Sequence, residues 1–299
     1  KEVLVRGSYS TGFRAPSLYE LNAAQTFTNS GTVNDPLLCP TGSGSPAVCR
    51  AQFMVLNGGN LTLEPEKSKN ATLGLVVQPM NDLSVGLDFW WVRLKNQIGV
   101  VGDASLFAPA NYALFSQYFH RNSSNQLSTN GNQCPGANCG YVDVRQQNLG
   151  GTNTNGIDIT ANYRLHTAVG TFTFGLNSTY VAKYEYQDFR DGPWNQNVGV
   201  YSGTGPVFRW QHTLNTIWTK DQFTLGATAY YKSGYLDVDP VDRVSHYATL
   251  DVFGSWKPIK QATLTLGVRN VTDRDPPLSY QTQVFQAGYD PRFASAIGR

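Results

Sequence analysis

Long apolar runs are missing from this sequence of 299 residues, and so is a strong excess of either charge. No stretch approaches the roughly 18 consecutive apolar residues that a transmembrane helix needs, so a helical membrane protein is excluded. If the chain crosses a membrane, only a closed β-barrel remains, because lipid cannot satisfy the open edges of a sheet. Charged residues make up 15% of the chain and the formal net charge is +2, so we expect no nucleic-acid partner.

Cysteine is also scarce. The four cysteines form two local pairs, Cys39/Cys49 and Cys134/Cys139, each in a polar segment rich in Gly and Pro. A metal site would need further Cys or His ligands nearby, and only His120 is close, so we expect no metal and no cofactor. Two short disulfides in an oxidising compartment are favoured instead. Three pairings are possible, and local pairing is the one we predict.

Catalytic motifs are missing as well. The four histidines are scattered at positions 120, 166, 212 and 246, and none has a Ser or Asp at the spacing of a known motif. Because no nucleophile motif is present, we expect that the protein is not an enzyme. An enzyme barrel, a passive porin-like transport barrel and a soluble β-rich glycan-binding module stay open as alternatives.

What the sequence does contain is alternation of apolar and polar residues at period two. In the clearest stretch, Phe172, Phe174 and Leu176 fall on one face, and Thr171 and Thr173 on the other. Successive side chains of a strand point to opposite faces, so each such strand has one apolar and one polar face. The predicted strands span residues 2–12, 66–78, 83–97, 156–166, 170–187, 206–219, 222–234, 246–257 and 262–271. This pattern predicts an all-β, antiparallel transmembrane β-barrel with lipid outside and water or a polar plug inside.

The predicted connections alternate in length, which orients the strands. Residues 78–82, 166–170, 220–221 and 258–261 form tight turns, whereas residues 13–65, 98–155, 188–205 and 235–245 form long connections. In outer-membrane barrels the short turns face the periplasm and the long loops face outside, so we expect the long loops to be extracellular. Nine strands is an odd number, and bacterial barrels have even numbers, so we expect a fragment that lacks at least one strand.

Charged residues on the polar phase of these strands are expected to face the lumen of the barrel, because a charge facing lipid costs roughly 2–4 kcal/mol at the midplane. This lumen set is Asp88, Asp158, Arg164, Lys183, Glu185, Arg209, Asp251 and Arg269. Arg93 falls on the apolar phase. It would face inward only if a bulge near Trp90 and Trp91 shifts the register, or it lies beyond the membrane. Aromatic residues cluster toward the strand ends, which indicates interfacial girdles.

Four segments of the chain carry a family resemblance. They are Gly-Phe-Arg-Ala-Pro-Ser-Leu-Tyr-Glu-Leu at 12–21, Asn-Leu-Thr-Leu-Glu-Pro-Glu-Lys-Ser at 60–68 followed by Leu73-Gly74, Asn-Thr-Asn-Gly-Ile-Asp at 153–158, and Gly-Val-Arg-Asn-Val-Thr-Asp at 267–273. Together they resemble the C-terminal half of a TonB-dependent outer-membrane receptor, over essentially the whole chain. An alternative interpretation is that each segment only marks a boundary between a loop and a strand, since Pro16 and Pro65 bias the backbone to extended conformations.

The resemblance implies a roughly 22-stranded barrel, closed by an N-terminal plug, in the bacterial outer membrane. It also implies import of a scarce large nutrient (a ferric siderophore, cobalamin or a glycan) energised by the TonB complex. The implied partners are outer-membrane lipid, the plug domain, the TonB complex and a small-molecule ligand. No plug precedes Lys1, and the family's last strand does not follow Arg299. We therefore expect residues 1–299 to be the C-terminal part of the barrel, unable to close or transport alone.

Ligand contacts are expected in the loops at 107–121 and 188–201. Aromatic side chains next to cations can stack on a catecholate, sugar or corrin and pair with an anionic group. The candidate residues are Tyr112, Tyr118, His120, Arg121, Arg190, Trp194 and Tyr201. The alternative is that these side chains pack the loops together, or form a short helix with a buried stripe.

Overall fold

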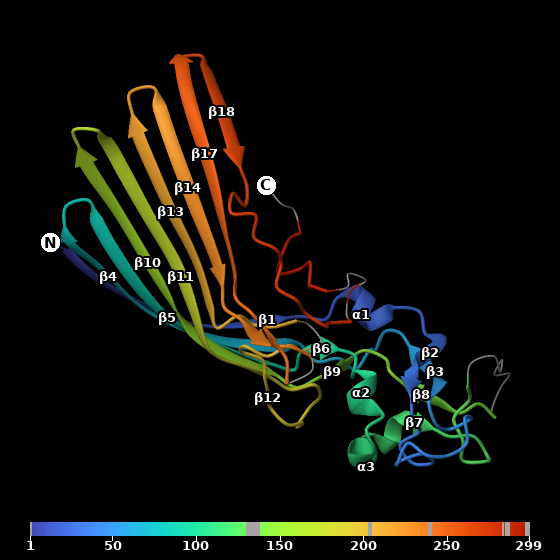
Figure 1. Cartoon of the computed structure of the whole chain (residues 1–299). Coiled ribbons are helices and arrows are strands. Elements are labelled where there is room, and N and C mark those ends of the chain that lie inside the picture. Colours follow the sequence, from blue (N-terminus) through green and yellow to red (C-terminus); the bar gives the residue numbers. More distant parts are fainter. Residues whose placement is uncertain are drawn as a thin grey trace.

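The computed structural model describes residues 2–129, 138–202, 205–238, 241–282, 284 and 288–296. Within these residues, nine strands follow one another in a single antiparallel sheet that is open at β1 and β18 (Figure 1). They are β1 (Glu2–Arg14), β4 (Glu66–Met80), β5 (Leu83–Lys95), β10 (Thr152–Thr167), β11 (Gly170–Tyr186), β13 (Trp210–Lys220), β14 (Phe223–Lys232), β17 (Tyr247–Ile259) and β18 (Ala262–Val268). All nine predicted strands are confirmed, and with them the all-β, incomplete barrel fold.

Tight turns join the strands at one end of the sheet, and the long connections leave it at the other end (Figure 1). Three of these turns use residues with positive φ: Asp82 at 63°, Gly170 at 129° and Asp221 at 50°. Glycine adopts such angles freely and Asp more easily than most residues, so the hairpins close without long loops. The local sequence therefore determines which connections between strands are short.

The long connections fold into a compact layer of short elements beyond the sheet. A four-stranded sheet in the order β2-β3-β8-β7 forms its centre. The elements in this loop layer are α1 (Leu18–Asn22), β2 (Thr26–Val33), β3 (Ala51–Asn57), β6 (Ile98–Gly99), α2 (Asp103–Leu106), η1 (Pro109–Asn111), α3 (Tyr112–Phe115), η2 (Ser116–Tyr118), β7 (Phe119–His120), β8 (Tyr141–Asp143), β9 (Gln147–Asn148), β12 (Asn195–Gln196), β15 (Tyr235–Leu236) and β16 (Arg243–Val244). None of them was predicted as a separate element, apart from the short helix that was an alternative for the loop at 107–121, where α3 lies.

The buried apolar core lies in the loop layer and not between the long strands. Phe53, Leu106 and Val142 are almost fully buried there and belong to one cluster with Phe115 and Phe119. By contrast, the described residues leave the apolar face of the sheet uncovered: Phe89 is 46% exposed and Leu266 is 72% exposed. Soluble proteins rarely expose an apolar surface this large, so the face must be covered by something outside the described residues.

The opposite face of the sheet is polar and carries side-chain interactions between strands. The strand register places Gly74 of β4 opposite Asp88 of β5, Asp88 opposite Asp158 of β10, and Asp158 opposite Thr179 of β11. The Thr179 hydroxyl donates to Asp158 Oδ1 at 2.7 Å. Arg6 Nη2 reaches across Gly74 to Asp88 Oδ2 at 2.6 Å, where a Cβ on Gly74 would collide with Asp88 Oδ1. Gly74 is needed for that cross-strand ion pair.

A β-bulge in β11 changes the face on which its last residues lie. Asn155 pairs with Lys183 and Gly156 with Val181, so β11 has one extra residue, Ala182. β10 keeps an unbroken register with β5 there, and Asn155 pairs with Trp91 on the apolar face. Paired residues share a face. The prediction that Lys183 and Glu185 share the polar face with Asp158 is therefore wrong, because the bulge reverses the alternation beyond Tyr180.

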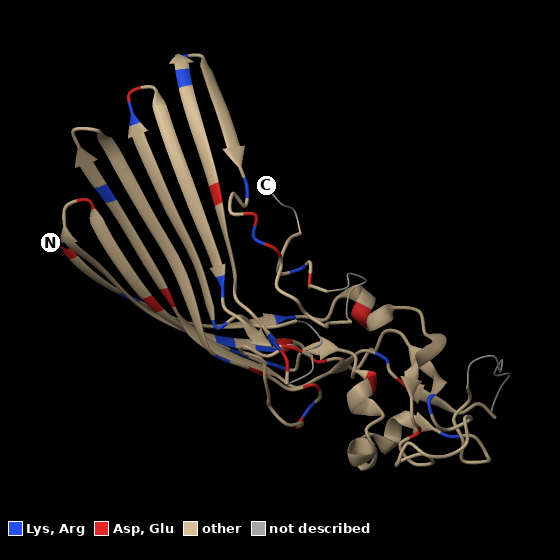
Figure 2. Ribbon diagram, viewed as in Figure 1, with Lys and Arg blue, Asp and Glu red and all other residues tan. Residues whose placement is uncertain are grey.

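The other charged residues of the predicted lumen set follow the expected phase. Arg164 and Asp251 lie on the polar face, opposite Thr173 and Thr228. Arg209 and Arg269 lie just outside the ends of β13 and β18. In Figure 2 most of the strand length carries no charge, and Lys, Arg, Asp and Glu gather where the strands meet the loop layer. Arg93 stays on the apolar phase, because β5 pairs with β4 in continuous register from Val85 to Lys95.

Candidate functional site

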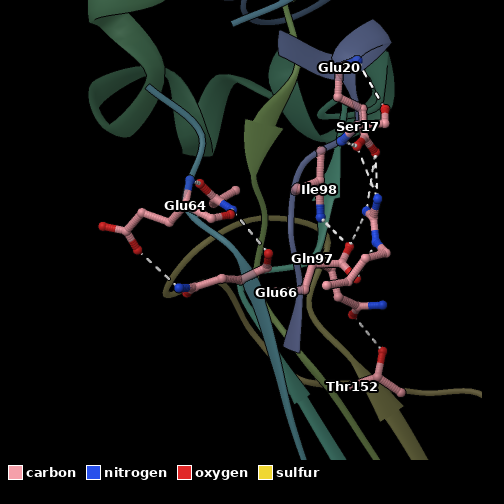
Figure 3. Close-up of polar contacts among 10 residues, drawn as sticks. Ser17, Glu20, Glu64, Glu66, Gln97, Ile98 and Thr152 are labelled. Atoms are coloured by element: carbon pink, nitrogen blue, oxygen red, sulfur yellow. Dashed lines mark hydrogen bonds and ion pairs between the residues drawn. The ribbon is translucent and has the colours of Figure 1, made fainter. Parts of the chain in front are cut away.

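Two of the sequence motifs meet at the junction between the sheet and the loop layer (Figure 3). Arg14, the last residue of β1, donates from Nη2 to Glu66 Oε1 at 2.7 Å and from Nη1 to Glu20 Oε2 at 2.9 Å. Glu20 also closes a capping box with Ser17 at the start of α1. The Arg14 guanidinium, with help from the Ser17 backbone, lowers the pKa of Glu20 to about 2. Glu66 accepts from the Ile98 amide at 2.8 Å, which ties the next loop to the same network.

The remaining motifs also have architectural roles. Gly156 lies at the bulge pairing, where a Cβ would stand 2.5 Å from Trp90 Cζ2, so only glycine leaves space for that ring. Asn270 has φ of 47° and forms a turn after β18, because its amide nitrogen donates to the Arg274 carbonyl at 3.1 Å. Its backbone N–H donates to Asp251 Oδ1 at 2.8 Å. These contacts give each motif a role in fastening strands to loops.

One predicted disulfide is confirmed and the other is partly seen. Cys39 and Cys49 are bonded, with their Cα atoms 5.5 Å apart, and they close the loop between β2 and β3. Cys139 is also disulfide-bonded. Its predicted partner, Cys134, lies outside the described residues.

Arg121 holds two loops together. Its guanidinium forms a two-pronged pair with Asp35, at 2.8 and 2.7 Å, and the side chains are 9% and 0% exposed. Arg121 also donates to the Tyr112 hydroxyl at 3.2 Å and lies over that ring. Burial raises the pKa of Asp35, but Arg121 and the amides of Leu37 and Leu38 outweigh burial and leave it below its ordinary value. The structure therefore gives Arg121 and Tyr112 a packing role, as the alternative interpretation expected.

Tyr201 and His120 are also occupied by contacts within the loops. Tyr201 is buried, and its hydroxyl donates to Asp290 Oδ2 at 3.0 Å. Burial, together with the hydrogen bond to Asp290, raises the pKa of Tyr201 to about 12. The His120 ring stacks on Tyr141 with centroids 4.5 Å apart. These two side chains connect segments that are distant in the sequence.

Three of the candidate ligand residues line open cavities. Tyr118 and Arg190 line one of about 390 Å³, together with residues that were not predicted: Asn60, Glu64, Gln117 and Gln147. Arg190 and Trp194 line a second cavity of about 410 Å³, together with Arg93 and Lys95. Arg190 thus contributes to both cavities, and its Nη2 lies 3.6 Å from Glu64 Oε2. Nothing in the sequence marked Gln117 and Gln147 as residues that line a cavity. Asn60 and Glu64 belong to the second of the four sequence motifs.

In the part of the chain that the structure covers, no group of three or more His, Cys, Asp or Glu residues could hold a metal ion. No helix among the described residues is long and apolar enough to cross a bilayer.

The chain was also compared with known protein families. The family model for the TonB-dependent receptor-like β-barrel matches residues 1–271. The chain belongs to this family. Its members are transport proteins and not enzymes, which agrees with the expectation from the sequence. A search of curated proteins found no match.

Solved structures with the same fold include proteins that are named for different ligands. The ferric enterobactin receptor PfeA (mutant G324V) of Pseudomonas aeruginosa is 18% identical, with a TM-score of 0.62 over 96% of this chain and 34% of that one. The siderophore receptor PirA of Acinetobacter baumannii is 14% identical, with a TM-score of 0.62 over 94% and 36%. The copper transporter OprC is 12% identical, with a TM-score of 0.50 over 91% and 32%. The chain spans about a third of the length of these proteins.

Proposed function

We propose that residues 1–299 are the C-terminal part of the barrel of a TonB-energised importer in the bacterial outer membrane. The observation that carries this proposal is the uncovered apolar face of the sheet, in a chain of this family. Lipid would cover that face, and the interfacial aromatic residues would mark the membrane boundaries. The N-terminal plug domain and the TonB complex would be partners of the longer receptor that carries this chain.

In this proposal the polar face lines the lumen. Asp88, Asp158, Arg164 and Asp251 would face water or the plug, and Arg209 and Arg269 would lie at the ends of the same face. The cross-strand contacts of Arg6 with Asp88 and of Thr179 with Asp158 support this orientation, since they satisfy polar groups along the wall. These groups would contact the plug and solvent, with no part in catalysis.

The proposed ligand contacts centre on the 390 Å³ cavity between α3, the segment before β4 and the loop after β11. Tyr118 offers an aromatic face and Arg190 a cation, whereas Glu64 and the amides offer hydrogen bonds. A ferric siderophore is the first ligand to test, because one structurally similar protein is named a siderophore receptor and another a ferric enterobactin receptor.

Uptake by the full-length receptor tests the importer proposal. Cells that express it should accumulate a radiolabelled ferric siderophore, and accumulation should stop when TonB is deleted or the proton-motive force is collapsed. A passive porin-like barrel would keep its uptake under both treatments. Persistence of uptake without TonB would therefore reject the energised mechanism and favour that alternative.

Two substitutions test the ligand cavity. Tyr118→Ala and Arg190→Ala should each weaken siderophore binding by about 10-fold or more, while the receptor remains folded in the outer membrane. Arg50→Ala is the matched control, since Arg50 is an exposed arginine directly after the Cys39–Cys49 disulfide and does not line the cavity. Equal binding by all three variants would place ligand recognition elsewhere.

A further inference from the structure

Four cations gather on the apolar face of the sheet, at the loop ends of β4 and β5. This basic quartet consists of Lys67, Lys69, Arg93 and Lys95. Lys67 pairs directly with Lys95 in the β4–β5 register, and Lys69 pairs directly with Arg93. The same unbroken register aligns Leu73 with Phe89, four residues farther along each strand, so the quartet shares their face. All four side chains are exposed.

Like charges directly opposite each other destabilise a sheet, and the quartet contains two such pairs. No ion pair or hydrogen bond of these four side chains occurs among the described residues. Glu185 lies on the same face, because Arg93 pairs with Asn153 and Asn153 pairs with Glu185. The Glu185 carboxylate, however, forms an ion pair with Lys183 at 2.7 Å. Among the described residues, none of the four cations therefore has an ion-pair partner, and an external anion would stabilise this arrangement.

The level of the quartet indicates where such an anion would come from. On the same face, a row of rings runs across three strands: Tyr180 to Trp210 at 4.6 Å, Trp210 to His212 at 5.2 Å and His212 to Tyr231 at 5.3 Å between centroids. The register aligns Tyr180 with Ile157 and Ile157 with Phe89. Arg93 is four residues beyond Phe89 on the loop side. On β5 itself, Trp91 lies on the same face between Phe89 and Arg93. Because aromatic residues of this kind mark the membrane–water interface, the quartet lies next to that interface on the loop side, at the level of lipid headgroups.

A cavity beside the quartet provides space for a headgroup. The cavity of about 410 Å³ is lined by Arg93 and Lys95, by Arg190 and Trp194 from the loop after β11, and by Asp191. Three cations to one acid favour an anionic occupant, and the Trp194 ring suits an interfacial position. The apolar strand surface that continues below would contact the acyl chains of the same molecule.

We propose that the basic quartet and this cavity bind the phosphate groups of an anionic lipid in the outer leaflet of the outer membrane. The inference rests on the proposed function for the membrane location, but it concerns the outside of the barrel and not the import path. Phosphate is the anion that suits several closely spaced Lys and Arg side chains, because it presents more than one acceptor oxygen at once.

Lipid retention by the full-length receptor tests the proposal. The receptor would be reconstituted in phosphatidylcholine discs containing either diphosphoryl lipid A or its dephosphorylated form, and the lipid that stays bound after detergent exchange would be measured by native mass spectrometry. The wild type should retain the phosphorylated form at least about 10-fold better, with retention falling as salt rises. A variant with Gln at 67, 69, 93 and 95 should lose that preference.

The matched control carries Gln at Lys220, Lys257 and Lys260, which lie at the tight-turn end of the sheet, and it should retain the phosphorylated lipid like the wild type. Equal retention of both lipids by the wild type, or unchanged retention by the quartet variant, would overturn the proposal. Displacement of the lipid by an equal concentration of inorganic phosphate would also overturn it, since the site would then bind the free ion. Siderophore uptake, measured in parallel, should be unchanged in the quartet variant, so a failure of the importer proposal would be visible separately.

Discussion

Replacing Arg121 should loosen the loop layer by an amount that the geometry allows us to estimate. The Asp35 carboxylate is fully buried and receives both prongs of the Arg121 guanidinium, as well as the Leu37 and Leu38 amides. Arg121→Leu would leave this charge buried without its partner, and breaking a buried ion pair in this way costs about 3–5 kcal/mol. Since about 1.4 kcal/mol corresponds to a factor of ten, local opening should become about 100- to 4,000-fold more frequent.

Hydrogen–deuterium exchange of the full-length receptor would measure this opening. Amides of residues 35–39 and 119–126 should exchange faster in Arg121→Leu, whereas the amides of β10 and β11 should not change. The double variant Asp35→Asn with Arg121→Leu should recover much of the protection, because Asn removes the buried charge and keeps an acceptor for Leu37 and Leu38.

A second ion pair serves as control. Arg145 pairs with Asp143 at 2.6 Å, but the two residues are close in sequence and the Arg145 side chain is 32% exposed. Exposed pairs contribute about 0.2–1 kcal/mol, so Arg145→Leu should change exchange by at most about five-fold. Unchanged exchange at residues 35–39 in Arg121→Leu would refute the reasoning, and so would an equal effect of both substitutions.

Three further predictions concern the junctions. Gly156→Ala should lower the thermal stability of the refolded barrel, which a melting curve would detect, because the new Cβ would collide with the Tyr180 carbonyl oxygen as well as the Trp90 ring; an unchanged melting temperature would count against this role of Gly156. Arg14→Lys keeps the positive charge but loses the guanidinium that donates to both Glu20 and Glu66. A protease should therefore cut residues 17–25 faster than in the wild type, and an identical digestion rate would count against this role. The pKa of Tyr201 is raised to about 12, so the stability that its protonated hydroxyl contributes is complete below the ordinary pKa near 10 and is lost as the pH rises through 12. Tyr201→Phe lacks this hydroxyl, so hydrogen-exchange protection around Asp290 should fall less at alkaline pH than in the wild type.

The long strands could be predicted from sequence because period-two alternation is a local signal. Each of the nine long strands places its apolar residues on one face, and the turns at Asp82, Gly170 and Asp221 use residues that tolerate positive φ. The bulge at Ala182 left no such signal, because a single extra residue alters the phase without altering composition. The assignment of Lys183 and Glu185 depended on that phase and failed with it.

The candidate ligand residues show a different limit. Aromatic and cationic side chains in a loop look the same in sequence whether they bind a ligand or a partner within the protein. Arg121 is satisfied by Asp35, 86 residues away, and Tyr201 by Asp290, 89 residues away. Only the three-dimensional arrangement separates these two from Tyr118, Arg190 and Trp194, which line open cavities. The disulfide between Cys39 and Cys49 was predictable, because short-range pairing dominates when two cysteines share one loop.

The most direct test of the barrel assignment is accessibility of the two faces in native outer membranes. Single cysteines would be introduced at Asp158 on the polar face and at Leu87 on the apolar face of a plug-deleted receptor, and treated with a membrane-impermeant thiol reagent. We expect labelling at position 158, and protection at position 87 together with quenching of an attached fluorophore by a lipid-phase quencher. Labelling at position 87 with protection at 158 would contradict the account, because it would place the apolar face in water.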